Sequence, residues 1–265
     1  MNLGFIGAGN MASAIIKGII NANYMDAKNI NVYDVDTNKL KELNADLKIN
    51  IMENNEELIA QSDIIILAIK PNMFDKVLKD LKNNFKNKTV VSIAAGLQLE
   101  DLENILSKDD AIIRVMPNVN VSINKGVSAI TSNENVKQED INIVMDIFNS
   151  VGKAYQMDEK DFRAFTGIAG CSPAYAYLFI DSLARAATKN GIPKDLATEI
   201  AAHAVLGSAQ KIIESDENPW GLIDQVCSPG GTTIAGLLKL EEEGFMNAIV
   251  QCIDETIKKD KELTK

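Results

Sequence analysis

Apolar and polar residues alternate in two different rhythms along the first half of the chain. Short apolar runs predict buried strands, and apolar residues that recur every three or four positions predict helices. We expect strands at residues 3–6, 30–34, 47–52, 63–69, 89–94 and 111–116. We expect helices at residues 9–22, 38–43, 55–61 and 74–85. Strands that alternate with helices through short connections predict a doubly wound, mostly parallel sheet of the α/β class.

The rhythm changes in the second half. Residues 126–131 and 153–156 are expected to add two strands, on either side of a helix near Val144. From about Asp158 onward the periodicity is almost entirely helical. Pro173 opens a helix that ends at Asn190-Gly191, and Pro193 opens a second one that is rich in alanine. Two further helices are predicted, one ending near Leu240 and one over residues 245–258.

The first strand runs directly into Gly7-Ala8-Gly9-Asn10-Met11-Ala12, which has the spacing G-x-G-x-x-A. This spacing matches the dinucleotide fingerprint, with alanine in place of its last glycine. Gly7 allows a tight turn, Gly9 lets a pyrophosphate approach the backbone, and the following helix offers free N–H groups. The alternative is an ordinary strand-to-helix turn that requires glycine.

Four other predicted strands also end in residues that suit a ligand. They are followed by Asp34, by Lys70-Pro71, by Ala95-Gly96 and by Met116-Pro117-Asn118. In a doubly wound sheet the carboxyl ends of parallel strands share one edge, and ligands bind there. The sequence therefore predicts one site built from five strand ends.

Composition narrows the class of protein. The chain has 265 residues, of which 46% are hydrophobic and 24% charged, as in a soluble globular protein. A net charge of −10 argues against nucleic acids and anionic membranes as partners. No signal peptide or membrane span is evident, and the three cysteines lie far apart, so we expect a cytoplasmic protein. One histidine, His203, makes a catalytic triad or a metal site improbable, and no metal is expected.

Six motifs, in order along the chain, carry a resemblance to a known family. They are Gly7–Ala12, Ala68-Ile69-Lys70-Pro71, Ser92–Gly96, Arg114-Val115-Met116-Pro117-Asn118, Ser172-Pro173-Ala174-Tyr175 and Ser228–Gly236. On these stretches the chain resembles the pyrroline-5-carboxylate reductases, from its first strand almost to its last helix. The first motif is common to many dehydrogenases, whereas the last one and the Met-Pro-Asn turn are far more specific. The family pattern usually has Gly-Ser-Gly where this chain has Gly170-Cys171-Ser172, and a serine at position 172 would narrow the approach to the backbone there.

The resemblance implies the last step of proline biosynthesis, in which NADPH or NADH reduces L-1-pyrroline-5-carboxylate to L-proline. It implies a dinucleotide-binding Rossmann domain over residues 1–157 and an all-helical substrate-binding and dimerisation domain over residues 158–265. It also implies a homodimer or a larger ring in which a neighbouring subunit completes the substrate pocket. The cofactor residues that we expect are Ile6, Gly7, Ala8, Gly9, Asn10, Met11, Asp34, Asn55, Ile69, Lys70, Pro71, Ala95, Gly96, Met116 and Asn118. The expected substrate residues are Ser228, Gly230, Gly231, Thr232 and Thr233.

The segment Ser228–Thr233 suits a cyclic imine that carries a carboxylate. Backbone N–H groups of Gly230-Gly231-Thr232 at a helix start suit the carboxylate. A hydroxyl can hydrogen-bond the imine nitrogen and so assist hydride transfer to the neighbouring carbon, and Thr233 is the catalytic position that the resemblance implies. From the residues alone, a helix N-cap with good capping residues explains the segment equally well.

Two other classes of protein are weighed against this one. A β-hydroxyacid or ketoacid reductase of the same two-domain plan would use a helical lysine as its acid, for which Lys189 and Lys211 are candidates. A non-catalytic dinucleotide sensor would not need the turn at Gly230–Thr233. For a pyrroline-5-carboxylate reductase, Asp34 favours NADH because its carboxylate would meet the 2′-phosphate of NADPH. The alternative is that Asp34 only caps the next helix.

Overall fold

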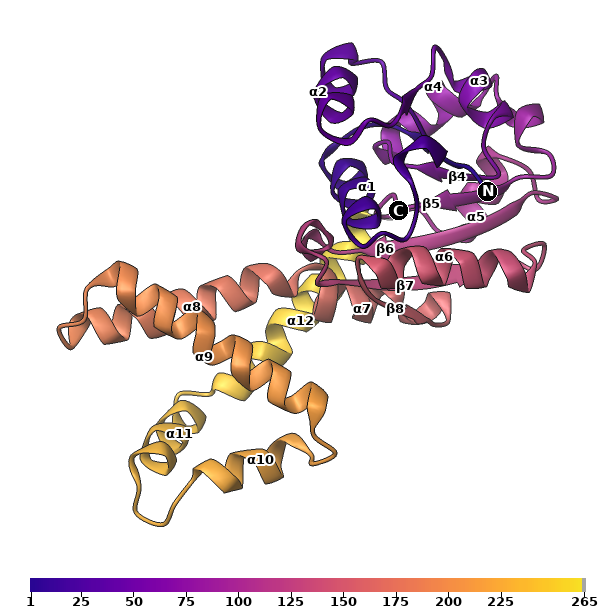
Figure 1. Cartoon of the computed structure of the whole chain (residues 1–265). Helices are drawn as coiled ribbons and strands as arrows, with labels where there is room; N and C mark the ends of the chain where they lie inside the picture. Colours follow the sequence, from indigo (N-terminus) through magenta and orange to yellow (C-terminus); the bar gives the residue numbers. More distant parts are fainter. Residues whose placement is uncertain (264–265) are drawn as a thin grey trace. The chain divides into compact units, whose positions relative to one another are not determined.

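The computed structural model describes residues 1–263 and divides into two compact units (Figure 1). The first unit contains Met1–Gly170 together with the chain from Ile257 on, and the second contains Cys171–Thr256. The first unit therefore continues past residue 157, and the functional boundary at 157/158 stays a prediction. None of the helices in the described residues is long and apolar enough to cross a membrane.

Eight strands in the described part of the chain form one sheet, in the order β3-β2-β1-β4-β5-β6-β7-β8. They are β1 (Leu3–Ile6), β2 (Ile30–Tyr33), β3 (Asn50–Ile51), β4 (Ile64–Leu67), β5 (Thr89–Ser92), β6 (Ala111–Pro117), β7 (Gly126–Ser132) and β8 (Gly152–Gln156). The pair β6/β7 is antiparallel, and every other neighbouring pair is parallel. The predicted mostly parallel, doubly wound sheet is thereby confirmed. The register places Ile6 opposite Tyr33 and Leu67, so these strands end at one edge.

Helices cover both faces of this sheet. They are α1 (Asn10–Asn21), α2 (Thr37–Leu47), α3 (Asn55–Ala60), α4 (Phe74–Leu78), α5 (Leu99–Ile105), α6 (Gln138–Ser150) and α7 (Phe162–Phe165). Short 3-10 turns lie between them: η1 (Ala27–Asn29), η2 (Pro71–Met73), η3 (Lys82–Phe85), η4 (Val119–Ile123) and η5 (Glu159–Asp161). The π-helical turn η6 (Thr166–Gly170) ends the segment.

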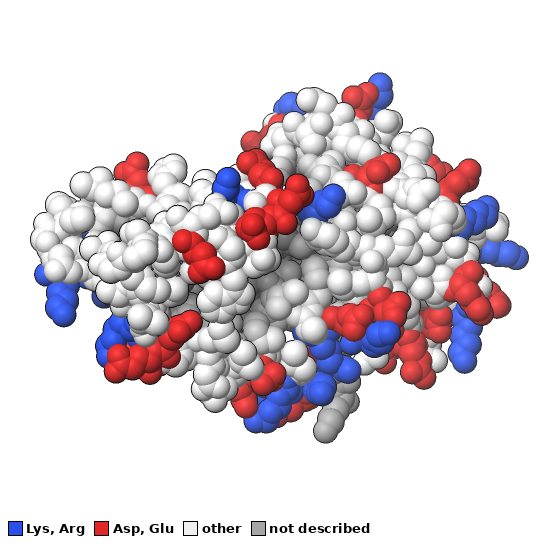
Figure 2. Space-filling model, turned by 90° about the horizontal axis from the view of Figure 1, so that it is seen from below, with Lys and Arg blue, Asp and Glu red and all other residues white. Residues whose placement is uncertain are grey.

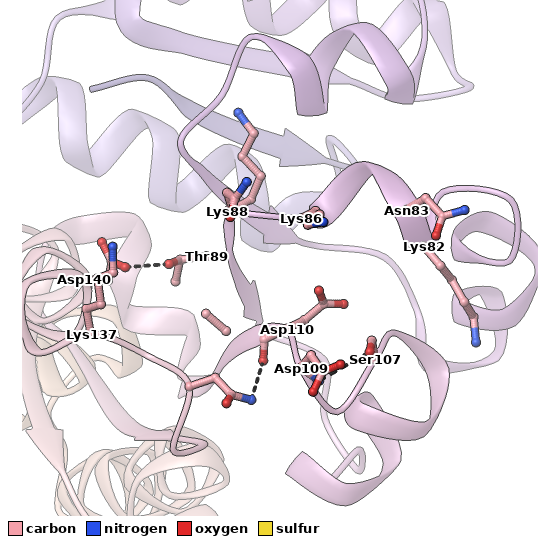
Figure 3. Close-up of a pocket in the computed structure, with 13 residues that line it drawn as sticks. Lys82, Asn83, Lys86, Lys88, Thr89, Ser107, Asp109, Asp110, Lys137 and Asp140 are labelled. Atoms are coloured by element: carbon pink, nitrogen blue, oxygen red, sulfur yellow. Dashed lines mark hydrogen bonds between the residues drawn. The ribbon is translucent and has the colours of Figure 1, made fainter.

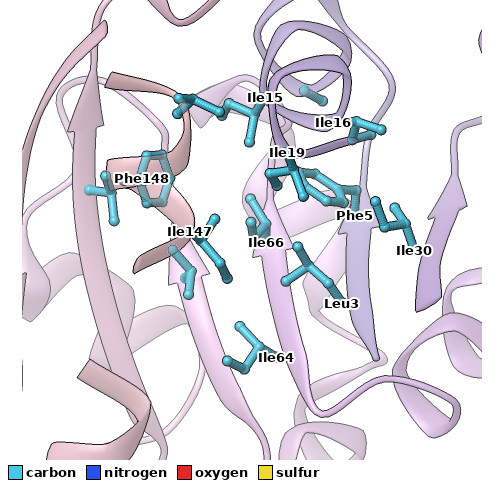
Figure 4. Close-up of a cluster of buried hydrophobic side chains, with 14 of the residues drawn as sticks. Leu3, Phe5, Ile15, Ile16, Ile19, Ile30, Ile64, Ile66, Ile147 and Phe148 are labelled. Carbon is cyan, nitrogen blue, oxygen red and sulfur yellow. The ribbon is translucent and has the colours of Figure 1, made fainter. Parts of the chain in front are cut away.

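Alternation along the strands separates two cores. Leu3 and Phe5 of β1 face one way and pack with Ile15 of α1 and Phe148 of α6, as Figure 4 shows. Ile6, next in the strand, faces the other way and packs in the core that also holds residues of α3, α4 and α5. Because both faces are covered, the central strands are apolar at almost every position, which is why their runs are easy to recognise in the sequence.

Two expectations about this unit are wrong in detail, and one helix was not expected. The strand expected over residues 47–52 shrinks to Asn50–Ile51, because α2 continues to Leu47 and turns at Lys48 in the left-handed region. The helix expected over residues 74–85 ends at Leu78, and the chain re-forms as η3. The sequence analysis also missed α5, a seven-residue helix that a Gln98/Asp101 capping box begins.

The second unit is entirely helical within the described residues. Its helices are α8 (Ser172–Lys189), α9 (Lys194–Glu214), α10 (Pro219–Val226), α11 (Thr232–Glu242) and α12 (Phe245–Leu263), the last of which runs on into the first unit. Asn190 caps α8 and Gly191 has φ +98°, as the Asn-Gly pair predicts. Large uncharged areas cover this unit, at the left of Figure 2. The prediction of an all-helical part is confirmed.

Candidate functional site

The glycine motif forms a tight turn with an open approach. Gly7 has φ +107°, and a Cβ there would lie 2.7 Å from the carbonyl oxygen of Ala68, so this position requires glycine. A Cβ on Gly9 would meet nothing within 4 Å, which leaves the backbone accessible. Gly9 is the N-cap of α1, and no side chain of the described residues caps that helix. The first N–H groups of α1 are therefore available to an anionic ligand such as a pyrophosphate.

Asp34 is fixed against this turn by both of its carboxylate oxygens. Oδ2 accepts a hydrogen bond from the backbone N–H of Ala8 at 2.7 Å, and Oδ1 accepts one from Asp36 N–H at 2.8 Å. Asp36, not Asp34, is the N-cap of α2 and accepts from the N–H groups of Asn38 and Lys39. The alternative that Asp34 only caps the helix is therefore wrong. The Lys39 ammonium lies 3.8 Å from Asp36.

Two neighbouring strand ends continue the same edge of the sheet. Lys70 is exposed where β4 gives way to η2, and Ala95 is exposed after β5. Gly96, in the β5–α5 loop, has φ +86°. Asn55, the first residue of α3, has a buried Oδ1 without a hydrogen-bond partner among the described residues. A buried, unpaired amide oxygen is uncommon, and a ribose hydroxyl would satisfy it. These features fit a bound dinucleotide.

The end of β6 differs from the others because its polar side chain points into the protein. Asn118 is 4% exposed, and its Nδ2 donates to the carbonyl oxygen of Ala169 at 2.9 Å. Its Oδ1 accepts from the N–H groups of Asn120 and Val127. Asn118 thus shapes the turn after β6, and the side chain has little capacity left for a ligand. A cofactor contact of Asn118 stays a prediction, and backbone atoms would have to make it.

The substrate segment lies in the second unit, between α10 and α11. A turn closes from Gly231 N–H to the carbonyl oxygen of Ser228 at 3.0 Å, and Gly230 has φ +69°. Gly231 is the N-cap of α11, and this helix too lacks a side-chain cap within the described chain. The alternative interpretation, that Ser228–Thr233 serves only as a side-chain cap of α11, is therefore not supported by the hydrogen bonds at this helix start. Thr232 and Thr233 are both exposed in the single chain, and Gly231 is partly exposed.

A separate cavity of about 590 Å³ opens at the amino ends of β5 and β6, near Thr89 and Ala111 (Figure 3). Its rim includes Asp140, which accepts a hydrogen bond from Thr89 Oγ1 at 2.8 Å. Burial, with the nearby Asp109 carboxylate, raises the pKa of Asp110. Because the cavity lies at the amino ends of these strands, it is at the edge of the sheet opposite the glycine turn. Ligands of doubly wound sheets bind at the carboxyl ends. The cavity is distinct from the predicted site.

Comparisons with known proteins decide the family. Residues 159–263 match the family model described as pyrroline-5-carboxylate reductase dimerisation, and residues 2–96 match the model described as NADP oxidoreductase, coenzyme F420-dependent. The pyrroline-5-carboxylate reductase of Escherichia coli is 39% identical over 99% of this chain and 98% of its own length. The chain belongs to the pyrroline-5-carboxylate reductase family.

Two solved structures extend this relationship to the whole fold. A pyrroline-5-carboxylate reductase from Streptococcus pyogenes is 42% identical with a TM-score of 0.87, and it covers 99% of this chain and 98% of its own. The Plasmodium falciparum family member, solved with NADP bound, is 35% identical with a TM-score of 0.89 and covers 100% of this chain and 98% of its own. The chain thus carries the self-association domain of the family and a fold that binds a nicotinamide dinucleotide.

Within this family fold, the structure gathers the predicted cofactor residues at one edge of the sheet in the first unit. The predicted substrate residues form one turn in the second unit. Sequence analysis missed Glu159, which forms a 2.7 Å ion pair with Arg114 Nη1. The available signal was Arg114 itself, a charged residue inside the apolar run of β6. The roles of the individual site residues stay predictions.

Proposed function

We propose that this protein reduces the C=N bond of L-1-pyrroline-5-carboxylate to give L-proline, the last step of proline biosynthesis, with hydride from a reduced nicotinamide dinucleotide. The observation that supports this most directly is a pair of uncapped helix starts. One follows Gly7 and Gly9 at α1, and the other follows Gly230 and Gly231 at α11. The first suits the pyrophosphate of the cofactor, and the second suits the carboxylate of the substrate.

In this proposal the residues of the second unit orient the imine. The N–H groups at the start of α11, from Thr232 onward, bind the carboxylate, and the Thr233 hydroxyl hydrogen-bonds the imine nitrogen. A bound reduced nicotinamide supplies the hydride that adds to the imine carbon. The C=N π electrons move to nitrogen, which gains a proton and becomes the secondary amine. A hydrogen bond at nitrogen stabilises the charge that changes there in the transition state.

We infer that NADH is well used, although the Plasmodium falciparum family member was solved with NADP bound. Asp34 places a negative charge beside the Ala8 N–H, at the start of the glycine turn. Each carboxylate oxygen has a second lone pair, which leaves capacity to accept a hydrogen bond from a ribose hydroxyl. The Lys39 ammonium is a nearby cation that could attract a 2′-phosphate. It lies 3.8 Å from the Asp36 carboxylate, which offsets its positive charge.

We also propose that the active form is a homodimer or a larger ring in which a neighbouring copy completes the substrate pocket. The exposure of Thr233 in the single chain supports an incomplete pocket.

The chain's three cysteines, Cys171, Cys227 and Cys252, are all unpaired in the described residues, which suits the reducing cytoplasm.

The test is an assay of reduced nicotinamide oxidation with pyrroline-5-carboxylate, set against a panel of 2-keto acids. We expect turnover with the cyclic imine and at least a hundredfold lower kcat/KM with every keto acid, about 2.7 kcal/mol or more of discrimination. A preference for a keto acid would replace the proposal by a ketoacid reductase, and tight dinucleotide binding without turnover would indicate a sensor. Lys189 and Lys211, the candidate acids of the ketoacid class, are exposed on α8 and α9.

A further inference from the structure

The loop between β5 and α5 carries two of the predicted cofactor residues, Ala95 and Gly96. Its outer side is accessible, since Ala95 is exposed, while Ala94 beneath it is buried. Gly96 adopts φ +86°, so the loop turns sharply there. Two residues separate Gly96 from Leu99, the first residue of α5. The position of Leu99 therefore sets the end of the loop that would face a dinucleotide.

One carboxylate oxygen ties that end to β6, while the Gln98/Asp101 capping box acts within α5 itself. Glu159 Oε1 accepts a hydrogen bond from Leu99 N–H at 2.8 Å and another from Arg114 Nη1 at 2.7 Å. The Arg114 guanidinium carbon lies 4.6 Å from the ring centroid of Phe162, and the Phe162 side chain is buried. Three elements, α5, β6 and η5, thus meet at a single atom. The Arg114 and Glu159 side chains are 11% and 27% exposed, so this ion pair is largely shielded from solvent.

We propose that Glu159 is a positioning residue for the dinucleotide, which it acts on through the β5–α5 loop. This inference rests on the proposed function. Glu159 holds Leu99 against β6, and the short tether to Gly96 transmits that restraint to the backbone that faces the cofactor. Glu159 lies 60 residues after Leu99, inside the segment that matches the dimerisation model. Glu159 is the first residue of that match and belongs to the first compact unit, so the restraint acts within that unit.

A second ion pair on the same cavity wall provides a matched control. Arg163 Nε lies 3.5 Å from Asp260 Oδ2, and both residues line the same cavity of about 320 Å³ as Glu159 and Arg114. The hydrogen bond to Leu99 N–H comes from Glu159, so this second pair is not the anchor of the loop. If Glu159 acts only by stabilising the fold, loss of either pair should have similar consequences. If Glu159 positions the loop, only its own loss should weaken dinucleotide binding in the folded protein.

The experiment measures the Kd of the full-length protein for NADH and NADPH without substrate, by titration calorimetry, in Glu159→Ala, Glu159→Gln and Asp260→Asn. We expect Glu159→Ala to raise both Kd values about tenfold, as for one lost charge-assisted hydrogen bond. Glu159→Gln retains an oxygen for Leu99 N–H, so its Kd should recover to within about threefold of wild type. Asp260→Asn should leave the Kd unchanged. In turnover, KM for the dinucleotide should rise while kcat at saturation is retained.

Amide hydrogen exchange locates the effect. Glu159→Ala should speed exchange in residues 93–102 and leave α1 unchanged, and Glu159→Gln should restore protection. A Glu159→Ala protein that binds both dinucleotides within twofold of wild type overturns the inference, as does an Asp260→Asn protein that loses binding equally. If Glu159→Ala does not fold, Arg114→Lys takes its place, because it weakens the anchor of Glu159 to β6. Its Kd for both dinucleotides should rise at least threefold, and an unchanged Kd overturns the inference. A wild type that binds neither dinucleotide contradicts the proposed function itself.

Discussion

The two compact units handle their apolar side chains in opposite ways. In the first unit, large residues such as Phe5, Ile66 and Phe148 are almost completely buried on the faces of the sheet. Among the described residues of α8 and α9 the buried ones are small, namely Pro173, Ala184, Ala197 and Ala201, and α10 and α11 have none. Large apolar residues of the second unit instead face outward, with Leu178 68% and Ile213 77% exposed.

This difference shows that a single chain can complete one core but not the other. Exposed apolar surface on this scale marks an interface, and the match to the dimerisation model covers these helices. The sheet unit carries its stability within one chain. We expect the helical unit to depend on a second copy for the burial that stabilises it, so its stability should depend on protein concentration.

The largest expected effect comes from placing a charge on the helical unit. Leu206 is 62% exposed on α9, and Leu206→Glu would bury an unpaired carboxylate in the dimer. We expect the dissociation constant of the dimer to rise about a thousandfold or more, from a penalty of roughly 4 kcal/mol. Sedimentation velocity measures this dissociation constant directly. An assay of the same variant should show loss of activity. Ile123→Glu, at a 69% exposed position of the sheet unit, is the control and should stay associated. An unchanged assembly in Leu206→Glu would place α9 outside the interface.

The next effect concerns the completed core. Phe148→Ala removes a fully buried ring from α6 and should lower the free energy of unfolding by about 3–5 kcal/mol. Because this core lies within one chain, the loss should be the same at low and high protein concentration. Phe179→Ala, on α8 beside Phe245 at 6.0 Å between ring centroids, should instead show a loss that depends on concentration. Chemical denaturation at two concentrations separates the cases, and a concentration-dependent loss in Phe148→Ala would contradict the comparison.

The third effect tests the chemistry of the helical unit. Thr233→Val retains the shape of the side chain and removes the hydroxyl that we assign to the imine nitrogen. Loss of a hydrogen bond to a charged group, roughly 1.5–3 kcal/mol, should lower kcat/KM for pyrroline-5-carboxylate about 10- to 150-fold. Thr232→Val, one residue earlier in the same helix turn, should have a smaller effect because its expected contact is through backbone. If kcat/KM of Thr233→Val falls by less than about threefold, the Thr233 hydroxyl does not assist at the imine nitrogen.

The same contrast between local and distant interactions explains what the sequence could predict. The central strands are predictable because burial on both faces makes their apolar runs continuous, as in Ile64–Leu67. The edge strand β3 is overestimated because alternation alone does not show where pairing stops. It ends after two residues, and α2 occupies the start of the expected range. The short helix α5 escapes prediction because seven residues give few repeats of the helical period.

The site divides in the same way. The positive φ of Gly7 and the uncapped start of α1 follow from local spacing, so the fingerprint reveals them. The role proposed for Glu159 depends on partners 45 and 60 residues away, which no local pattern specifies. Asp34 lies between these cases. Its place directly after β2 and its hydrogen bond from Asp36 N–H, two residues on, are local. Its hydrogen bond from Ala8 N–H, 26 residues away, comes only from the fold.

The smallest effect that we predict tests the chemistry of the sheet unit, at Asp34. A 2′-phosphate there would meet a carboxylate near the surface, where like charges cost a few kcal/mol at most, so we expect a preference for NADH of roughly 10- to 100-fold. Asp34→Ser removes the charge and retains an oxygen that can accept from Ala8 N–H, so the ratio of kcat/KM values should shift about tenfold toward NADPH. Asp36→Ser removes the same charge two residues on and keeps a good N-cap for α2, and the ratio should change by less than about threefold. The measurement is kcat/KM for both cofactors at matched ionic strength. A wild type that already prefers NADPH tenfold would show that Asp34 does not select the cofactor. Equal shifts in the two variants would show that net charge, and not the position of Asp34, governs the choice.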